Sequence, residues 1–357
     1  MIRSRQKNGL CIQRLSGFTT AGKLPVLMIL WFSFSFQVID ASRFQTYDYV
    51  VSKDYDGDFQ SIQDAFDAVP DCSSGEVKIY IRNGIYRGKL VLPQKKINVT
   101  ITGENKDSTI ITYDDFSGRI VNGDTLNTHN SCSFRILADN FRAEQITFEN
   151  SADRVGQAVA VEVNSDKVSF YNCRFIGNQD TYYTNSIGRI YMKNCYIEGT
   201  TDFIFGKSIT VFDSCIIHTK KHSYITAAST PEGYKYGYVF FNCILTADPD
   251  ITRVYLGRPW RDYARVVFFH CYLGDHVVPE GWHNWNKPWR ESTAYYAEYN
   301  CIGPGADRSG RVLWSKELSD QTAKKYTIKK IFSADAASPP FPDSWLPGRD
   351  LDEPSHH

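Results

Sequence analysis

Two aspartates stand at matching places in a phrase that this sequence repeats. The phrase is Val-x-Phe-x-Asn-Cys-x-Phe-x-Gly around Cys173 and Ile-x-Met-x-Asn-Cys-x-Ile-x-Gly around Cys195. Asp180 follows the first cysteine and Asp202 follows the second, each after seven residues. If each phrase forms one coil of a stacked structure, the two carboxyl groups lie one above the other, because neighbouring strands are about 4.8 Å apart. Carboxyl groups so close together can share acid–base or nucleophilic work.

Two glutamines also stand at matching places in the repeated phrase. Gln179 lies six residues after Cys173, and Gln157 lies six residues after Ser151, which ends an earlier and shorter version of the phrase. We therefore expect the two amides to stack beside the two carboxyl groups, within a patch barely two coils tall. Two acids and two neutral hydrogen-bond donors in so small an area indicate an active site.

The phrase continues along the chain and predicts the fold. Cys215, Cys243 and Cys271 repeat it at intervals of 20 to 28 residues, with apolar residues three positions before and two positions after each cysteine. Self-similarity at this period is typical of solenoids, and alternating β-branched and aromatic residues favour strands over helix pairs. One coil cannot bury its inward face alone, so stacking supplies the core. We expect an all-β chain that folds as a single right-handed parallel β-helix with these cysteines pointing inward.

The segments on either side of the repeats predict how the solenoid ends. Residues 61–69 have an amphipathic helical pattern with Ser61 as the N-cap, and this short helix would cover the open sheet edge at the N-terminal end. After residue 314 the repeat weakens. Residues 318–325 have a helical pattern, and the proline-rich stretch that follows is expected to wrap the surface.

The first 41 residues predict a secretory signal peptide. Residues 1–24 carry basic side chains and no acid, and residues 25–39 form a largely apolar run. This run is short for a membrane span, which takes roughly 20 residues, and the alternative is an uncleaved signal anchor. Either way the body of the protein is expected outside the cytosol. Residues 348–357 are expected to be a disordered tail.

Composition excludes some classes of partner and site. The formal net charge is zero, and no cluster of Lys and Arg is long enough to indicate nucleic-acid binding. Five of the nine cysteines stand at equivalent core positions, where a free thiol behaves as a small hydrophobe. A bridge between stacked neighbours stays open, as does the pairing of Cys72, Cys132 and Cys301. The absence of a Cys-x-x-Cys pair argues against zinc, and Asn98 begins a glycosylation sequon.

Four motifs carry a resemblance to a known family. They lie at residues 157–160 (QAVA), 177–181 (GNQDT), 199–206 (GTTDFIFG) and 256–260 (LGRPW). In order and spacing they resemble the signature motifs of pectin methylesterases, most of all the plant type that lacks the helical inhibitor-like pro-region. The resemblance runs from about Tyr49 to Trp345, so residues 42–347 are expected to form one catalytic β-helix domain.

The chain departs from the family pattern at a few positions. Tyr182 and Thr201 replace the family's usual leucine and valine, and Gly88 stands where an acidic residue is common. His129 lies where many members have an aromatic or small residue in the groove wall. None of these departures removes a catalytic group. They bear on substrate pattern and pH response rather than on the type of reaction.

The resemblance implies hydrolysis of the methyl esters of homogalacturonan (pectin) to pectate and methanol, which remodels the plant cell wall. Asp202 as nucleophile would form an acyl-enzyme anhydride. Arg258 can grip that carboxylate with two hydrogen bonds and keep it ionised. The like charge would raise the pKa of Asp180, which can then hold a proton for the departing methanol and act afterwards as base on water. Gln157 and Gln179 offer amide N–H donors to the oxyanion.

The resemblance also predicts a sugar-binding groove lined by aromatic side chains. The candidates are Trp260, Tyr183, Phe205 and Trp282, with His129 in the groove wall. Any of these aromatic side chains could instead belong to the core.

Two rival classes can be weighed on the same residues. Carboxyl groups about 5 Å apart would suit a retaining glycosidase, but oxyanion donors serve acyl transfer and not an oxocarbenium ion. A pectate lyase needs a calcium site of several acids near the groove, and the motifs supply only two. A non-catalytic wall-binding protein on this scaffold would need a broken catalytic residue, and none is broken.

The expected partners follow from this interpretation. We expect binding of methyl-esterified homogalacturonan and of a proteinaceous pectin methylesterase inhibitor, with no nucleic acid and no membrane contact after processing. We expect a monomer that needs no metal and no cofactor and that is secreted to the extracellular space and cell wall.

Overall fold

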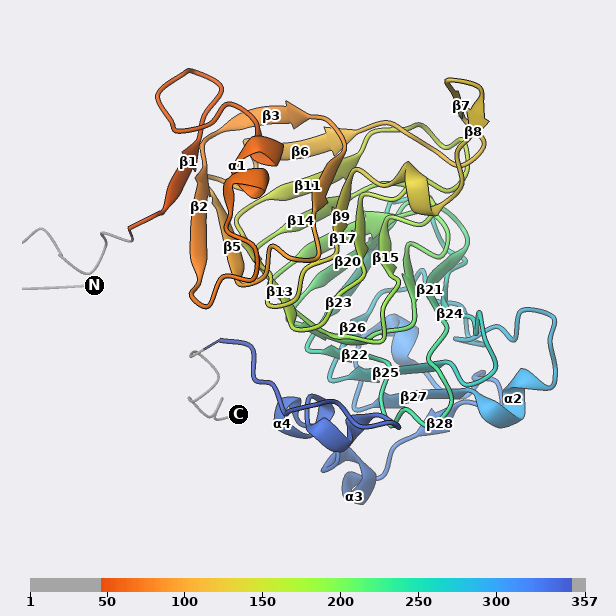
Figure 1. Cartoon of the computed structure of the whole chain (residues 1–357). Coiled ribbons are helices and arrows are strands. Elements are labelled where there is room, and N and C mark those ends of the chain that lie inside the picture. Colours follow the sequence, from red (N-terminus) through yellow and green to blue (C-terminus); the bar gives the residue numbers. More distant parts are fainter. Residues whose placement is uncertain (1–45, 349–357) are drawn as a thin grey trace, which may run out of the picture. The chain divides into compact units, whose positions relative to one another are not determined.

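The computed structural model describes residues 46–348, which wind into a stack of coils (Figure 1). Strands of successive coils pair in parallel and form three long sheets within this part of the chain. The first contains β1 (Tyr49–Val51), β2 (Val77–Ile81), β5 (Val99–Gly103), β10 (Arg142–Glu144), β13 (Val168–Tyr171), β16 (Arg189–Lys193), β19 (Ile209–Asp213), β22 (Tyr238–Phe241), β25 (Arg265–Phe269), β27 (Tyr295–Tyr299) and β28 (Lys316–Glu317). We call it the eleven-stranded sheet.

The other two long sheets complete each coil. The eight-stranded sheet contains β3 (Gly84–Arg87), β6 (Thr109–Tyr113), β11 (Thr147–Asn150), β14 (Arg174–Ile176), β17 (Tyr196–Gly199), β20 (Ile216–Thr219), β23 (Ile244–Ala247) and β26 (Tyr272–Leu273). The seven-stranded sheet contains β4 (Leu90–Leu92), β9 (Phe134–Ile136), β12 (Val161–Val163), β15 (Tyr182–Thr184), β18 (Ile204–Gly206), β21 (Tyr224–Ala228) and β24 (Tyr255–Gly257). A small antiparallel hairpin joins β7 (Ile120–Val121) to β8 (Asp124–Thr125). The predicted all-β, right-handed parallel β-helix is confirmed.

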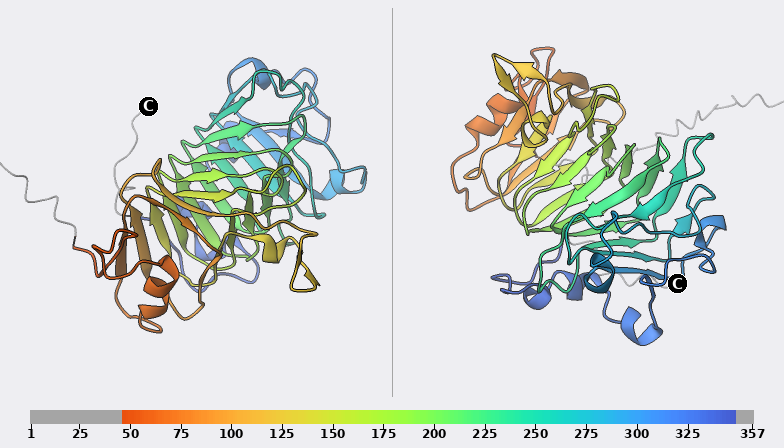
Figure 2. Two further views of the ribbon diagram at one scale, coloured as in Figure 1. Left: turned by 90° about the horizontal axis from the view of Figure 1, so that it is seen from above. Right: turned by 90° about the vertical axis from the view of Figure 1, so that its right-hand side faces the viewer.

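Each complete coil contributes one strand to each long sheet. β13, β14 and β15 form one coil, and β16, β17 and β18 form the next. Val168 lies opposite Ile190 and Phe170 lies opposite Met192, which is the register that the repeated phrase predicts. Figure 2 shows the resulting rows of strands from two further sides.

The repeated cysteines point inward and stack in register, as predicted. Cys173, Cys195 and Cys271 are at most 2% exposed. Each thiol donates a hydrogen bond to a backbone carbonyl of the preceding coil. Cys301 continues the series by one coil. The cysteines among residues 46–348, which include Cys72 and Cys132, are all free thiols.

The asparagine in the phrase has a backbone role. Asn172 and Asn194 each precede a core cysteine and have φ values of 53° and 54°, and His270 has a φ of 50° at the equivalent position. Asparagine tolerates this left-handed conformation better than most residues, because its short polar side chain can hydrogen-bond locally. The turn between the eleven- and eight-stranded sheets therefore repeats at the same place in each coil.

Phenylalanines stack along the interior in the same way. The ring centroids of Phe212 and Phe240 are 4.3 Å apart, and those of Phe240 and Phe268 are 4.4 Å apart. These residues lie three positions before Cys215, Cys243 and Cys271, so the same period that places the thiols also builds the aromatic column.

Helix α1 (Ile62–Ala68) covers the N-terminal end of the stack, as predicted. The Ser61 side chain accepts hydrogen bonds from the backbone N–H groups of Gln63 and Asp64, which satisfies two donors of the first turn. On the buried face, Phe66 stacks on Phe134 of β9 with ring centroids 5.8 Å apart.

Short helices occupy the later connections and the C-terminal segment. They are η2 (His129–Ser131), α2 (Arg290–Thr293), η3 (Pro304–Ala306), α3 (Asp320–Ala323), α4 (Ile328–Ile331) and η4 (Ala334–Ala336). Helix α3 is shorter than the predicted 318–325, because Ser319 is its N-cap and Lys324 is its C-cap.

The C-terminal segment lies against the outer face of the eleven-stranded sheet, as predicted. Phe332 packs on Tyr191. The fully buried Arg189 donates to the carboxylates of Asp166 and Asp343, the second of which is 154 residues further along the chain.

Some predictions concern residues that the structure does not describe. The predicted signal peptide, residues 1–41, lies outside residues 46–348, as does the predicted tail after Gly348. No helix among the described residues is long and apolar enough to cross a bilayer. Asn98 of the sequon lies in the turn before β5, and its side chain donates to the carbonyl of Ser73.

Candidate active site

The polar residues of the four motifs meet on the outer face of the seven-stranded sheet. Gln157 and Gln179 stand at equivalent points of two successive coils, before β12 and β15. Asp180 and Asp202 are likewise equivalent, each two residues before β15 or β18, and Arg258 follows β24. These five side chains line one cavity of about 350 Å³. The predicted stacking thus brings every proposed catalytic residue together.

The turn that places Asp202 depends on a glycine. A Cβ atom on Gly199 would lie 2.2 Å from the Cβ of Phe203 and 2.6 Å from the carbonyl oxygen of Asn178. Asp180 and Asp202 both have positive φ, at 67° and 50°. Aspartate tolerates this conformation better than most residues but at some cost, so the surrounding coil must hold both carboxyl groups in place.

Arg258 binds Asp202 with two parallel hydrogen bonds. Its Nε donates to one carboxylate oxygen at 2.9 Å and its NH2 nitrogen donates to the other at 2.6 Å. The guanidinium also lies over the ring of Tyr224 at 3.9 Å and over the ring of Trp285 at 3.6 Å. Burial raises the pKa of Asp202, and the hydrogen bonds and charge of Arg258 act against that rise without cancelling it.

Asp180 differs from its neighbour in having no partner. Its carboxyl group makes no hydrogen bond or ion pair with any residue between 46 and 348, and the residue is 8% exposed. Burial is the first cause that raises its pKa well above the ordinary value, and the charge of Asp202 is the second. The sequence interpretation gave the like charge as the cause, and the structure places burial ahead of it.

The two glutamines stack as predicted. Gln157 and Gln179 pair as neighbours in parallel, and the backbone N–H of Ala158 donates to the carbonyl of Gln179. Neither side-chain amide has a hydrogen-bond partner among the described residues. Both amides are therefore available to an oxygen of a ligand in the cavity.

Aromatic side chains form one wall of the cavity. Tyr183 and Phe205 stack in parallel, with ring centroids 4.2 Å apart, and Trp260 lies beside Phe205 at 5.9 Å. All three line the cavity. A carboxyl group held by an arginine, a second buried carboxyl group and two free amides beside an aromatic wall suit acyl transfer on a sugar derivative.

Comparison with known proteins identifies the family. A family model described as Pectinesterase matches residues 48–335. The chain belongs to the pectinesterase family. Its activity is accordingly the demethylesterification of pectin by ester hydrolysis, and the lyase, glycosidase and wall-binding alternatives are not favoured.

Individual pectinesterases support the same assignment. Pectinesterase 31 of Arabidopsis thaliana is 41% identical over 280 residues, which is 76% of this chain and 88% of that protein. Pectinesterase QRT1 of the same plant is 36% identical over 83% of this chain and 78% of its own length. The solved pectin methylesterase from carrot is 33% identical, has a TM-score of 0.74, and is matched over 82% of this chain and 93% of that one.

Trp282 is the one predicted groove aromatic of this pectinesterase that the structure contradicts. It is 1% exposed and packs in the core between Phe268 and Tyr296. Its indole N–H donates to Glu298. Trp282 pairs with Gly257 in the coil, and this position directs its side chain inward, away from the substrate face.

Trp285 and Tyr224 are the site residues that sequence reasoning missed. Trp285 lines the cavity that Trp282 was expected to reach. It has a φ of 60°, and Asn286 follows with a φ of 55°, so a tight turn carries the indole outward. The turn-forming asparagine next to Trp285 is a signal that could have distinguished the two tryptophans.

His129 lines the same cavity and belongs to a network around a buried acid, and its part in a sugar-binding groove stays a prediction. Its ring is 5.2 Å from that of Tyr183 and its Nδ1 is 3.5 Å from Glu162. Glu162, which is 2% exposed, also accepts from Arg135 at 2.9 Å and from Asn185 at 3.0 Å. Asn185 in turn accepts from the Tyr183 hydroxyl. The buried carboxylate of Glu162 thus holds Tyr183 of the aromatic wall in place through Asn185.

The residues that the structure describes include no group of three or more His, Cys, Asp or Glu side chains placed to hold a metal ion. Independence from metals and cofactors stays a prediction, which a chelator test addresses.

Proposed function

We propose that this pectinesterase uses Asp202 as the nucleophile and Asp180 as the acid and then the base. A carboxylate oxygen of Asp202 attacks the ester carbonyl carbon, and the methoxy oxygen leaves with the proton of Asp180 as methanol. Asp202 is then joined to the galacturonate as an anhydride. Water gives a proton to Asp180 and its oxygen to the anhydride, which releases the galacturonic acid and restores both aspartates.

One contrast in the site carries this assignment. Asp202 is held by Arg258 through two hydrogen bonds, whereas Asp180 is buried beside it without a partner. The arginine favours the ionised form of Asp202, and burial favours the protonated form of Asp180. Two carboxyl groups in environments that push their protonation apart suit one nucleophile and one acid.

Gln157 and Gln179 supply the remaining catalytic element of the proposal. Negative charge develops on the carbonyl oxygen when Asp202 attacks, and neutral amide donors stabilise it without a competing charge. Their free amides line the same cavity as the nucleophile. A glycosidase would have no use for donors at this point.

The aromatic wall is proposed to hold the sugar chain. A solved pectin methylesterase in complex with a hexasaccharide, 27% identical with a TM-score of 0.73, supports the binding of an extended galacturonan. Methylated galacturonan is nearly neutral, so stacking on Tyr183 and Trp260 suits it better than ionic capture. Trp285 takes the place that the sequence interpretation gave to Trp282.

Steady-state kinetics on highly methylated pectin test these roles. Arg258→Ala is expected chiefly to lower kcat, because the nucleophile loses its orientation, and Trp260→Ala is expected chiefly to raise KM. Arg253→Ala, at an exposed arginine outside the cavity, is the matched control. An Arg258→Ala variant with unchanged kcat and weakened binding would make the arginine a substrate clamp and contradict its role beside Asp202.

The type of reaction is tested by its products. Methylated pectin should release methanol without new reducing ends, and excess chelator should leave the rate unchanged. New reducing ends would indicate chain cleavage, and loss of activity that calcium restores would favour a lyase.

The setting of the reaction is also part of the proposal. Secretion to the cell wall through the predicted signal peptide fits the charge and apolar pattern of residues 1–41. We further propose a monomer that a proteinaceous pectin methylesterase inhibitor can bind, in line with relatives named as pectinesterase/pectinesterase inhibitor. Glycosylation at Asn98 stays a prediction, and glycosidase treatment of the secreted protein tests it by a shift in mass.

A further inference from the structure

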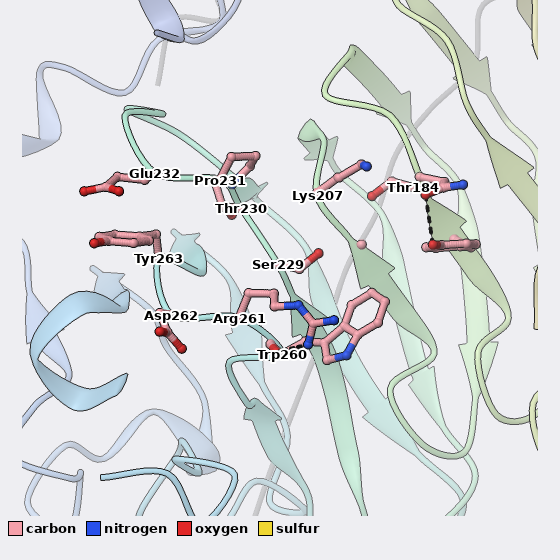
Figure 3. Close-up of a pocket in the computed structure, with 13 residues that line it drawn as sticks. Thr184, Lys207, Ser229, Thr230, Pro231, Glu232, Trp260, Arg261, Asp262 and Tyr263 are labelled. Atoms are coloured by element: carbon pink, nitrogen blue, oxygen red, sulfur yellow. Dashed lines mark hydrogen bonds between the residues drawn. The ribbon is translucent and has the colours of Figure 1, made fainter. Parts of the chain in front are cut away.

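A pocket on the outer face of the eleven-stranded sheet lies apart from the catalytic cavity. It has a volume of about 540 Å³ and is lined by the last residues of β22, β25 and β27 and by residues in and after α3. It shares no lining residue with the catalytic cavity or with the pocket beside that cavity, which Figure 3 shows. In Figure 1, α3 and α4 lie at the end of the solenoid opposite α1. We call this space the C-terminal pocket.

Aromatic rings from three successive coils line one side of the C-terminal pocket. Phe241, Phe269 and Tyr299 are neighbours in register. The ring centroids of the first two are 5.3 Å apart, and those of the last two are 5.0 Å apart. Tyr326 packs beside Phe269 at 5.1 Å. Phe269 is buried, whereas the other three residues are partly exposed. Partly exposed rings at successive levels of the solenoid can pack against the apolar faces of sugar rings.

Lysines without partners stand beside these rings. Residues 321–334 contain four lysines and no acid, although the formal net charge of the chain is zero. Lys324 lines the pocket, and Lys325 follows it. Lys330 donates to the backbone carbonyl of Lys324 at 2.7 Å, which brings Lys329 and Lys330 next to the first pair. All four residues are exposed. The ammonium groups of Lys324, Lys325 and Lys329 make no hydrogen bond or ion pair with any residue between 46 and 348.

The two acids that flank the lysines in the sequence are engaged by other groups. Asp320, which lines the pocket, accepts a hydrogen bond from the hydroxyl of Tyr299 at 2.9 Å. Asp335 pairs with Lys235 at 2.7 Å. The three free ammonium groups outnumber Asp320 at the pocket, so their charge is available to an anionic ligand.

We propose that the C-terminal pocket and its lysines form a second, non-catalytic binding site for de-esterified galacturonan, the polyanion that the enzyme's own reaction produces. The aromatic rings contact the sugars, and the ammonium groups form charge-assisted hydrogen bonds with the free carboxylates. Methylated pectin is nearly neutral and gains only the ring contacts, so the site distinguishes product from substrate. The inference goes beyond the proposed function and does not depend on the roles of Asp180 and Asp202.

A second site of this kind holds the enzyme on polymer that has already lost its esters. Because the site lies on a different sheet from the catalytic cavity, one chain can occupy it while another chain is hydrolysed. Binding at one site then raises the effective concentration of the substrate at the other. Exposed charges contribute modestly, so loss of the three free ammonium groups should weaken binding about tenfold at low salt. The difference should disappear in 1 M salt, where the Debye length is about 3 Å.

Isothermal titration calorimetry at low salt tests the site with a fully de-esterified oligogalacturonate. Polyglutamate with the same number of carboxylates is the comparison probe, because it lacks sugar rings. The wild type is expected to bind the oligogalacturonate more tightly than polyglutamate. A variant that combines Lys324→Gln, Lys325→Gln and Lys329→Gln should bind the oligogalacturonate about tenfold more weakly. Its kcat/KM on a short, fully methylated oligomer should stay at the wild-type value.

Two further variants control for charge and for the catalytic cavity. The combination of Lys53→Gln, Lys95→Gln and Lys221→Gln removes three exposed lysines elsewhere on the chain and should keep the wild-type Kd. Trp260→Ala, in the catalytic cavity, should keep it as well, and a Kd weakened by this variant instead would place the product in the catalytic cavity.

The outcomes separate this inference from the proposed function. The site is overturned if the wild type does not bind the oligogalacturonate, if the variant at residues 324, 325 and 329 keeps the wild-type Kd, or if polyglutamate binds as tightly. Methanol release from methylated pectin would be unaffected in each of these cases, so the proposed function would stand. Absence of methanol release from the wild type would contradict the proposed function instead.

Discussion

Arg258 and Arg311 each hold a buried carboxylate with two parallel hydrogen bonds, but in different surroundings. Arg258 holds Asp202 in the catalytic cavity. Arg311 holds Glu298 near the C-terminal end of the solenoid, with both donor–acceptor distances at 3.0 Å. Glu298 is 2% exposed and Asp202 is 6% exposed, so burial alone does not distinguish the two pairs.

The pair at the C-terminal end is fully satisfied. Glu298 also accepts from Arg308 at 2.7 Å and from the indole of Trp282 at 3.3 Å. The other N–H groups of Arg311 donate to the backbone carbonyls of Val278, Pro279 and Gly305. The polar atoms of this pair therefore have no free position for a ligand, and the cluster connects β27 to the loops that contain Pro279 and Gly305.

The catalytic pair is surrounded by groups that lack partners. Asp180 has no hydrogen bond, and the amides of Gln157 and Gln179 are free within the described residues. All three line the cavity beside Asp202. The comparison indicates that an arginine–carboxylate pair can take part in catalysis when the polar groups around it lack partners. Four predictions distinguish the Arg258–Asp202 pair from the Arg311–Glu298 pair.

Replacement of the nucleophile should have the largest effect. Asp202→Asn is nearly isosteric but cannot attack the ester, so kcat for methanol release should fall by about 10⁴-fold or more. Thermal unfolding checks that the variant is folded. Substantial turnover by a folded Asp202→Asn protein would remove Asp202 from the nucleophile role.

Removal of one oxyanion donor should come next. Gln179→Ala deletes an amide that makes no hydrogen bond within the described chain, so kcat should fall by about 10²–10³-fold with little change in stability. Asn178→Ala, which instead removes a hydrogen bond to the carbonyl of Ala152, is the neighbouring control. Equal kcat values for wild type and Gln179→Ala would exclude this donor role.

Substitution in the Arg311–Glu298 pair should lower stability and leave kcat nearly unchanged. Glu298→Gln leaves Arg311 and Arg308 without a buried counter-charge, which should cost about 3 kcal/mol or more of unfolding free energy. The turnover number of the folded fraction should stay close to that of the wild type. Denaturant unfolding and kinetics below the transition measure the two quantities, and a kcat loss as large as that of Asp202→Asn would erase the distinction between the regions.

The smallest effect concerns stability and pH. The pKa of Asp180 is raised in the folded state, so between the unfolded value of about 3.9 and the folded value the native state binds more protons than the unfolded state. The stability contributed by protonated Asp180 is present below the unfolded pKa and is lost as pH rises through the folded pKa. Asp180→Asn lacks this loss, so its stability relative to the wild type should increase from pH 4 to neutral pH in thermal unfolding. A relative stability that decreases over this range would contradict the raised pKa.

The fold and the stacked polar groups could be predicted because the period of the sequence repeat determines which residues of successive coils lie side by side. Once Cys173 and Cys195 occupy equivalent positions, Asp180 must lie beside Asp202. The left-handed turn before each core cysteine, at Asn172 in one coil, strengthens that period with a local conformational preference.

Features outside the repeat could not be predicted in this way. Trp282 and Trp285 lie in the irregular segment after β26, where no period tells an inward side chain from an outward one. The hydrogen bond from Arg189 to Asp343 joins residues far apart in the chain, so no local sequence pattern predicts it. The unpaired state of Lys324 within the described chain likewise depends on which side chains other loops bring near.

The most direct test of the central claim is the protonation of Asp180 itself, measured by infrared difference spectroscopy of the wild type against Asp180→Asn across a pH series. The account predicts a protonated carboxylic-acid band that persists in the wild type above the pH at which ordinary carboxyl groups ionise, and that is missing from Asp180→Asn but retained in Glu298→Gln. If the wild type shows no such band, or if the band survives in Asp180→Asn and disappears in Asp202→Asn, the roles of the two aspartates are not those assigned here.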